Sequence, residues 1–136
     1  MNDKEQTLSI IKPDAVERNL SDKIKQIFTK NGLLILDTKK LHISKDEAAE
    51  FYKVHQSKSF YDQLCSYLSS GPIEVMILSG EKAVSKNREL MGATDPTNAK
   101  EGTIRKLFGV SIDKNSVHGS DSVDNAKIEI NFFFDK

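Results

Sequence analysis

Cysteine is almost absent from this chain, which has a single one, Cys65, among 136 residues. An intramolecular disulfide is therefore impossible, and a zinc site built on paired cysteines is excluded. Cys65 follows Leu64 in an apolar pattern with helical spacing, where a free cysteine is usually a small core residue. We expect Cys65 to be buried and to take no part in catalysis.

The sequence also lacks an excess of charge and a long apolar run. It has 20 basic and 20 acidic residues, so its formal net charge is zero. This balance provides no global field for nucleic acid or an anionic membrane, and any anion has to be held by a local cluster. No apolar run approaches the ~18 residues of a membrane span, and residues 1–6 do not resemble a signal peptide. We expect one cytoplasmic globular domain, residues 1–136.

Strands and helices alternate in the predicted secondary structure. Apolar alternation and apolar runs predict strands at 8–12, 33–43, 73–78 and 117–118. Helical spacing and capping residues predict helices at 22–30, after Ser44, and at 61–68, 85–91, 103–108 and 122–134. Residues 93–115 are mostly irregular, and a loop of this length is usually functional or disordered. The element order alone fits an α/β or an α+β sandwich and leaves the sheet order open.

One histidine, His118, lies among small, hydroxylic and carboxamide side chains in the segment Asn115–Ser122. Gly119 lets the backbone approach a ligand closely. A neutral imidazole is a competent nucleophile near pH 7, and histidine carries covalent intermediates in enzymes. Upstream, segments 93–96 and 102–105 supply threonine and arginine groups suited to phosphate. A nucleophile beside an anion-binding cluster suggests phosphoryl transfer through a phosphohistidine.

Three segments together resemble the nucleoside diphosphate kinase family. They are Ile11-Lys12-Pro13-Asp14, A-T-D-P-x-x-A-x-x-G-T-I-R from residue 93, and N-x-x-H-G-S-D-S from residue 115. The match covers nearly the whole chain, and the three runs in register are highly specific. The resemblance implies a ferredoxin-like α+β sandwich, with helices packed on a four-stranded antiparallel sheet. It also implies ping-pong transfer of the γ-phosphoryl group of a nucleoside triphosphate, through phospho-His118, to a nucleoside diphosphate, which maintains the NTP and dNTP pools.

The resemblance assigns catalytic roles residue by residue. His118 is the nucleophile, and Glu129 is the carboxylate that orients its ring. Ser120 is a hydroxyl beside the histidine, Tyr52 is a phenol donor near it, and Lys12 contacts the substrate. Without the resemblance, Glu129 would be interpreted as part of a solvated helix face.

The same likeness identifies the nucleotide contacts, which are Lys12, Phe60, Arg88, Thr94, Arg105, Ile112 and Asn115. Among them, Arg88, Thr94 and Arg105 face the phosphates, while Lys12 and Asn115 bind the ribose hydroxyl and nearby phosphate oxygens. Arginine is scarce here, with three residues against 17 lysines, and two of the three lie among these contacts. The guanidinium group matches phosphate oxygens in a way that lysine cannot reproduce.

The base is expected to stack on Phe60, with Ile112 on the opposite side of the slot. Stacking tolerates every base, because each has a π-face, so weak base selectivity follows. A core position is the alternative for Phe60. Lys58-Ser59 replaces the Arg-Pro that usually precedes this aromatic in the family, and the loss of proline loosens the loop. Segment 18–22 lacks the glycines commonly found there.

The expected cofactor is Mg²⁺, which would arrive on the nucleotide phosphates. No His, Asp and Glu cluster has the spacing of a protein-held metal site, and neither a P-loop nor a G-x-G-x-x-G motif occurs. The expected partners are nucleoside di- and triphosphates and further copies of the chain. The resemblance implies a hexamer or a tetramer, although the chain lacks the longer C-terminal tail of many members. Neither a membrane nor a specific nucleic-acid partner is expected.

Two other function classes remain open from the sequence. One is a non-catalytic ferredoxin-like module that binds nucleotide or nucleic acid. Against this class stand the intact His118 with Arg88 and Arg105, and the neutral charge. The other is a histidine-dependent phosphohydrolase, which would consume ATP without an acceptor diphosphate.

Overall fold

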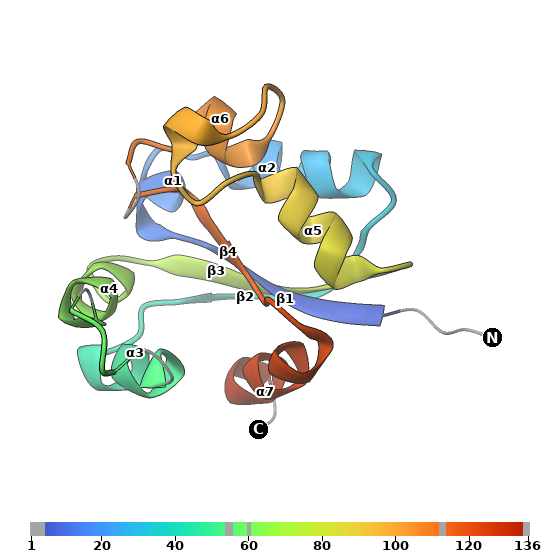
Figure 1. The fold of residues 1–136 in the computed structure, drawn as a ribbon. Coiled ribbons are helices and arrows are strands. Elements are labelled where there is room, and N and C mark those ends of the chain that lie inside the picture. The colour runs from blue at the N-terminus through green and yellow to red at the C-terminus, as the bar shows by residue number, and fades with distance from the viewer. Residues whose placement is uncertain (1–4, 54–55, 60, 112–113, 135–136) are drawn as a thin grey trace.

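The structure is a computed structural model that describes residues 5–53, 56–59, 61–111 and 114–134. Four strands form one sheet (Figure 1): β1 (Glu5–Ile11), β2 (Leu34–Leu41), β3 (Ile73–Gly80) and β4 (Val117–Gly119). Their order across the sheet is β2-β3-β1-β4, and each neighbouring pair is antiparallel. The predicted four-stranded antiparallel sheet of an α+β fold is thus confirmed.

Helices cover both faces of the sheet. One face carries α1 (Pro13–Glu17), α2 (Ser21–Lys30), α5 (Ala83–Met91) and α6 (Ile104–Phe108) (Figure 1). The opposite face carries α3 (Lys45–Phe51), α4 (Tyr61–Leu68) and α7 (Val123–Phe134). A single 3₁₀ turn, η2 (Pro96–Asn98), lies between α5 and α6. None of the helices in the described ranges is long and apolar enough to cross a membrane.

The side chains of β1 alternate between two hydrophobic cores. Ile11 packs with Phe28 of α2 in the first core. Leu8 and Ile10 point to the other face and pack in the second core, which also contains Cys65. Successive residues of a strand face opposite sides, so β1 joins the two helical layers. Cys65 is buried, as predicted.

Most predicted elements are present at or near the predicted positions. Helix α4 has the predicted bounds, and the capping box at the start of α3 is complete: the Ser44 hydroxyl accepts from Glu47 N, and the Glu47 carboxylate accepts from Ser44 N. Two helical segments were not predicted, and both begin with a proline, Pro13 in α1 and Pro96 in η2. Proline is favoured at the first helical position, where its missing N–H is not needed, so Pro13 ends one element and starts the next.

Segment 18–22 turns without a glycine. Asn19 adopts a φ of 61°, in the left-handed region, and α2 begins two residues later at Ser21. Asparagine enters this region more readily than most side chains, so it takes the place that a glycine would fill.

Candidate active site

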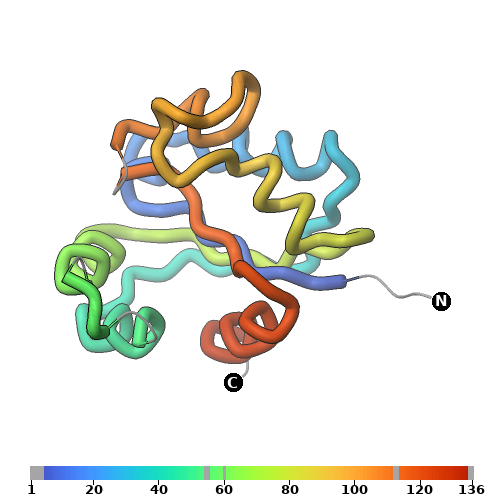
Figure 2. The backbone as a smooth tube through the Cα atoms, in the orientation of Figure 1, coloured from blue at the N-terminus to red at the C-terminus, as the bar shows by residue number. Residues whose placement is uncertain are grey.

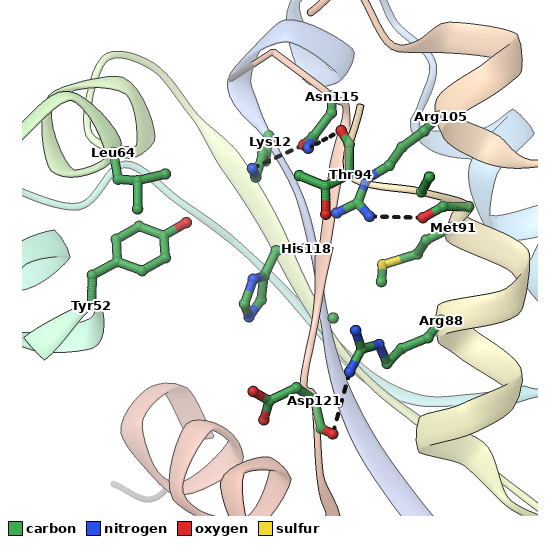
Figure 3. Close-up of a pocket in the computed structure, with 13 residues that line it drawn as sticks. Lys12, Tyr52, Leu64, Arg88, Met91, Thr94, Arg105, Asn115, His118 and Asp121 are labelled. Atoms are coloured by element: carbon green, nitrogen blue, oxygen red, sulfur yellow. Dashed lines mark hydrogen bonds between the residues drawn. The ribbon is translucent and has the colours of Figure 1, made fainter. Parts of the chain in front are cut away.

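A cavity of about 630 Å³ opens beside β4, at the edge of the sheet where the two helical layers meet (Figure 3). Its volume is typical of small-molecule sites. The predicted site residues that line it are Lys12, Tyr52, Arg88, Thr94, Arg105, Asn115 and His118. These seven residues come from segments far apart in the sequence, and the fold brings them to one place.

Strand β4 sets the direction of His118. In the β1–β4 ladder, Ile10 is opposite His118, and Ile11 is opposite Val117. Paired residues project to the same face of a sheet, so His118 faces the layer of α3 and α7, while Val117 is buried in the first core. The tube trace shows β4 running along β1 before the chain enters α7 (Figure 2). The imidazole is therefore fixed by strand pairing as well as by its own contacts.

Glu129 of α7 holds one nitrogen of the imidazole. His118 Nε2 lies 3.1 Å from Glu129 Oε1, and the Ser120 hydroxyl donates to the same oxygen at 2.8 Å. A carboxylate can only accept, so Nε2 carries a proton, and in the neutral imidazole Nδ1 then keeps its lone pair. Within the described part of the chain, Nδ1 makes no hydrogen bond. The arrangement leaves one ring nitrogen available as a nucleophile and fixes the tautomer through the other.

Aromatic rings pack on the histidine from α3 and its C-terminal end. Phe51 contacts the imidazole edge-on, with ring centroids 5.3 Å apart, and the Tyr52 ring centroid lies 6.3 Å away. Burial raises the pKa of Tyr52 above its ordinary value, and the charge of Glu129 adds to the shift. The phenol therefore stays protonated at neutral pH and remains a hydrogen-bond donor toward the cavity.

Arg105 presents a buried cation on the opposite side of the cavity. Its guanidinium donates to the backbone carbonyl of Gly92 at 3.0 Å and to that of Val117 at 2.8 Å. Burial lowers the pKa of Arg105 to about 10, and the charge of Arg88 contributes to the shift. The group is still charged at neutral pH. Two backbone anchors hold this cation rigidly, which suits a preorganised phosphate site.

The second arginine of the cavity, Arg88, has fewer anchors than Arg105. It is exposed on the last turn of α5, and its only described bond is a long one, 3.4 Å, to the backbone carbonyl of Asp121 (Figure 3). Such a side chain can reorient toward an anion at little cost. The third arginine of the chain, Arg18, lies outside the cavity and donates to Asp14 and to the Phe108 carbonyl.

Lys12, Asn115 and Thr94 form a hydrogen-bonded chain along one wall. The Lys12 ammonium donates to Asn115 Oδ1 at 3.0 Å, and Asn115 Nδ2 donates to the Thr94 carbonyl at 3.1 Å. Lys12 and Asn115 are 5% and 2% exposed, so both are nearly withdrawn from water. A charged and an amide group held together in this way can meet a hydroxyl and a phosphate oxygen of one ligand.

Gly119 lines the cavity, but helix packing is the reason that it must be glycine. A Cβ at this position would lie 2.3 Å from Asn87 Nδ2 and 3.0 Å from the Met91 side chain. The absence of a side chain lets α5 pack directly on β4, which brings Arg88 beside His118. The sequence interpretation, in which Gly119 serves close approach of a ligand, missed this cause.

The cavity also contains residues that sequence reasoning did not predict as site residues, namely Leu64, Met91, Gly92, Ala93 and Asp121. Met91 lies one helical turn after Arg88, and this spacing places both on one face of α5. Leu64 and Ala93 carry no chemical group that would mark them in a sequence. Phe60 and Ile112, predicted to hold the base, lie outside the described residues.

The described residues contain no group of three or more His, Cys, Asp or Glu side chains that could hold a metal ion. The charged groups that line the cavity are three cations, Lys12, Arg88 and Arg105, with Asp121 as the one carboxylate among its described lining residues. This donor set fits an anion rather than a bare cation. A divalent ion is compatible with the cavity when an anionic ligand carries it.

Replacing Glu129 by glutamine tests the role of the carboxylate. Glutamine keeps an oxygen that can accept from His118, but it removes the charge that stabilises a positive imidazole. We expect the rate of nucleophilic attack by His118 to fall by about 10–100-fold, the value of a charge-assisted hydrogen bond. Asp124→Asn, on the exposed surface of the same helix, is the matched control. Equal rates in the two variants would show that Glu129 does not assist the histidine.

Comparison with known proteins gives a consistent result. The sequence profile of the family described as nucleoside diphosphate kinase matches residues 5–136. A nucleoside diphosphate kinase of Nitratiruptor sp. is 58% identical over 130 residues, which cover 96% of this chain and 95% of that protein. The crystal structure of the Aquifex aeolicus nucleoside diphosphate kinase is 38% identical, with a TM-score of 0.94 over 97% of this chain and 96% of its own. The Encephalitozoon cuniculi structure of the same name also has a TM-score of 0.94, at 37% identity, over 97% of this chain and 90% of its own.

Proposed function

The chain belongs to the nucleoside diphosphate kinase family, and on this premise we propose that it transfers the γ-phosphoryl group of a nucleoside triphosphate to His118 and then to a nucleoside diphosphate. This activity would maintain the NTP and dNTP pools. One observation carries the proposal: His118 is bound to Glu129 through Nε2, and it lines a cavity that also contains Lys12, Arg88 and Arg105.

The first half-reaction uses the free lone pair of Nδ1. This nitrogen attacks the γ-phosphorus, the bond to the β–γ bridging oxygen breaks, and the nucleoside diphosphate leaves. The ring gains positive charge as the P–N bond forms, and Glu129 stabilises that charge while Nε2 keeps its proton. The second half-reaction is the reverse, with a different diphosphate as acceptor, so a ping-pong scheme follows.

Phosphoryl transfer requires little covalent chemistry from the protein beyond the nucleophile, and it depends on positioning and charge. We assign Arg105, Arg88 and Thr94 to the phosphate oxygens. Lys12 and Asn115 are assigned to the ribose hydroxyl and adjacent phosphate oxygens, which their mutual hydrogen bond supports. Tyr52 is assigned as a hydrogen-bond donor, through its phenol hydroxyl, near the histidine. Phe60 and Ile112 remain the predicted base contacts.

Mg²⁺ is part of the substrate in this proposal, since it bridges phosphates and keeps several waters. Chelating the divalent ion with excess EDTA should lower the transfer rate by at least about 100-fold, because the phosphate charge is no longer neutralised. The thermal unfolding midpoint of the nucleotide-free protein should stay unchanged in the same buffer. A lower midpoint would instead indicate a metal held by the protein itself.

Initial-rate kinetics test the proposed activity. Measured with ATP and GDP as varied substrates, double-reciprocal plots should be parallel, as expected for a ping-pong mechanism, and GTP should form in step with ADP. ATP consumption without GDP would indicate a phosphohydrolase. Tight nucleotide binding without turnover would indicate a binding module.

We further propose that residues 1–136 form a single catalytic domain, which the family match over residues 5–136 supports. A cytoplasmic location is proposed as well, and a single free cysteine suits a reducing compartment.

A homo-oligomer, hexamer or tetramer, is part of the proposal. Leu34 and Leu36 on the edge strand β2 are 56% and 51% exposed, an apolar surface that association would bury. Light scattering coupled to gel filtration should give four or six chain masses at micromolar concentration. A monomer mass would contradict it.

A further inference from the structure

The backbone makes a strained turn immediately before His118. Ser116 has a φ of 76°, and Val117 N donates to the Asn115 carbonyl at 2.9 Å. A bond between residues two apart around a positive φ defines the γ-turn that is rare in proteins and costs free energy for any side chain other than glycine. Ser116 is fully buried, so water does not relieve this conformation.

A buried carboxylate on α1, that of Asp14, stabilises the turn and offsets its strain. The Ser116 hydroxyl donates to Asp14 Oδ2 at 3.1 Å, across 102 positions of sequence. Asp14, at the start of α1, is 8% exposed. Its other carboxylate oxygen accepts a short hydrogen bond from the Tyr67 hydroxyl, which in turn accepts from Asp14 N at 2.8 Å. Arg18 donates to Oδ2 at 3.1 Å, so the carboxylate is fixed on three sides.

The turn has a direct bearing on the nucleotide contacts. The Ser116 carbonyl accepts from Lys12 N at 2.8 Å, and the preceding residue, Asn115, accepts from the Lys12 ammonium. We propose that Ser116 is a positioning residue: its hydroxyl, held by Asp14 and Tyr67, maintains the γ-turn that places Asn115 and Lys12 against the nucleotide. This inference rests on the proposed function, since it deepens the assignment of that site.

The hydroxyl should affect binding more than chemistry. His118 is held separately, by its pairing with Ile10 and by Glu129. Asn115 is itself the first residue of the turn, so the turn sets the position from which its side chain meets Lys12 and the Thr94 carbonyl. Loss of the Ser116 hydroxyl is therefore expected to raise KM for ATP while the rate at saturation changes little. A general loss of folding would instead lower the rate at saturation and leave KM unchanged, because it only reduces the fraction of active protein, so the two effects can be separated.

Two substitutions of Ser116 separate the effect of its hydroxyl from the effect of its strained backbone conformation. Ser116→Ala keeps a side chain on a backbone with positive φ, so the strain remains, and it loses the hydrogen bond to the Asp14 carboxylate. We therefore expect KM for ATP in phosphoenzyme formation to rise about tenfold. Ser116→Gly also loses the hydroxyl, but glycine adopts the positive φ freely, so KM should stay within about threefold of the wild-type value. Ser69→Ala is the matched control, because among the described residues its hydroxyl bonds only to the helix carbonyls of Cys65 and Ser66 in α4.

Tyr67→Phe extends the test to the rest of the network. It should raise KM in otherwise wild-type protein, which has Ser116. It should have little further effect in the Ser116→Gly variant, since glycine adopts the turn without a hydrogen bond to Asp14. Equal KM values for Ser116→Ala and Ser116→Gly, or for Ser116→Ala and wild type, would overturn the inference. All variants are compared at matched far-UV circular dichroism spectra.

Calorimetric measurement of ADP affinity separates this inference from the proposed function. If wild-type protein forms no phosphoenzyme, the proposed function fails, and ADP affinity still decides the positioning role. About tenfold weaker ADP binding in Ser116→Ala, with near wild-type binding in Ser116→Gly, supports it. Unchanged ADP binding in Ser116→Ala overturns it.

Discussion

His118→Ala should abolish phosphoenzyme formation and lower the transfer rate by on the order of 10⁴-fold or more. The imidazole is the one nucleophile at which the proposed reaction divides into two half-reactions, and alanine leaves no group to accept the phosphoryl. Neither Ser120 nor Glu129 is placed to replace it, because the two are hydrogen-bonded to each other and neither lines the cavity. Nucleotide affinity should change little, since the cations of the cavity remain. The measurement is the rate of GTP formation from ATP and GDP.

His42→Ala provides the matched control for this substitution. His42 is exposed after the end of β2, where its Nε2 lies 2.9 Å from the Ser69 carbonyl, and it does not line the cavity. Its loss should leave the transfer rate within about twofold of wild type, as for most surface substitutions. Near-equal turnover in the two alanine variants would contradict a phosphohistidine mechanism.

Arg105→Gln should have the second-largest effect, a fall in kcat/KM of about 10²–10³-fold. The side chain is a buried cation whose pKa remains near 10, so it carries full charge at neutral pH. Glutamine removes that charge and cannot reach both the Gly92 and Val117 carbonyls, which loosens the wall of the cavity behind His118. Steady-state kinetics with ATP and GDP measure the loss.

The neighbouring residue on the same helix supplies the control. Lys106→Gln makes the same change from cation to carboxamide, but Lys106 is exposed and does not line the cavity. Its kcat/KM should stay within about twofold of wild type. A comparable loss in both variants would mean that the net charge of α6, and not the placement of Arg105, governs activity.

Local patterns were sufficient to predict most of the fold. Alternation of apolar residues in β1 reflects two cores, and the buried run of β3 reflects its central position between β2 and β1. The two helical segments missed from the sequence share one cause, a proline at their first position. Proline is compatible both with the end of a strand and with the start of a helix, and local sequence does not separate the two roles.

The motifs and the family resemblance predicted the site residues and the role of Glu129 beside His118, whereas other contacts that support the site were not predicted. Lys12 and Asn115 are bonded to each other across 103 positions, and Ser116 reaches Asp14 across 102. Such pairs depend on how β1 and β4 lie in the sheet, which no local spacing reveals. Gly119 is a similar case, because its reason, the approach of Asn87 and Met91, is tertiary. Phe60 and Ile112 lie outside the described residues, so their roles remain predictions.

The most direct test of the phosphohistidine is a labelling and chase experiment. The protein is incubated with γ-labelled ATP and Mg²⁺, separated from nucleotide, and then given unlabelled GDP. We predict a labelled protein whose adduct is acid-labile and base-stable, is absent from His118→Ala, and passes its label to GTP. Nucleotide binding without any labelled adduct would contradict the account and leave a protein of this fold that binds nucleotide but does not transfer phosphate through His118.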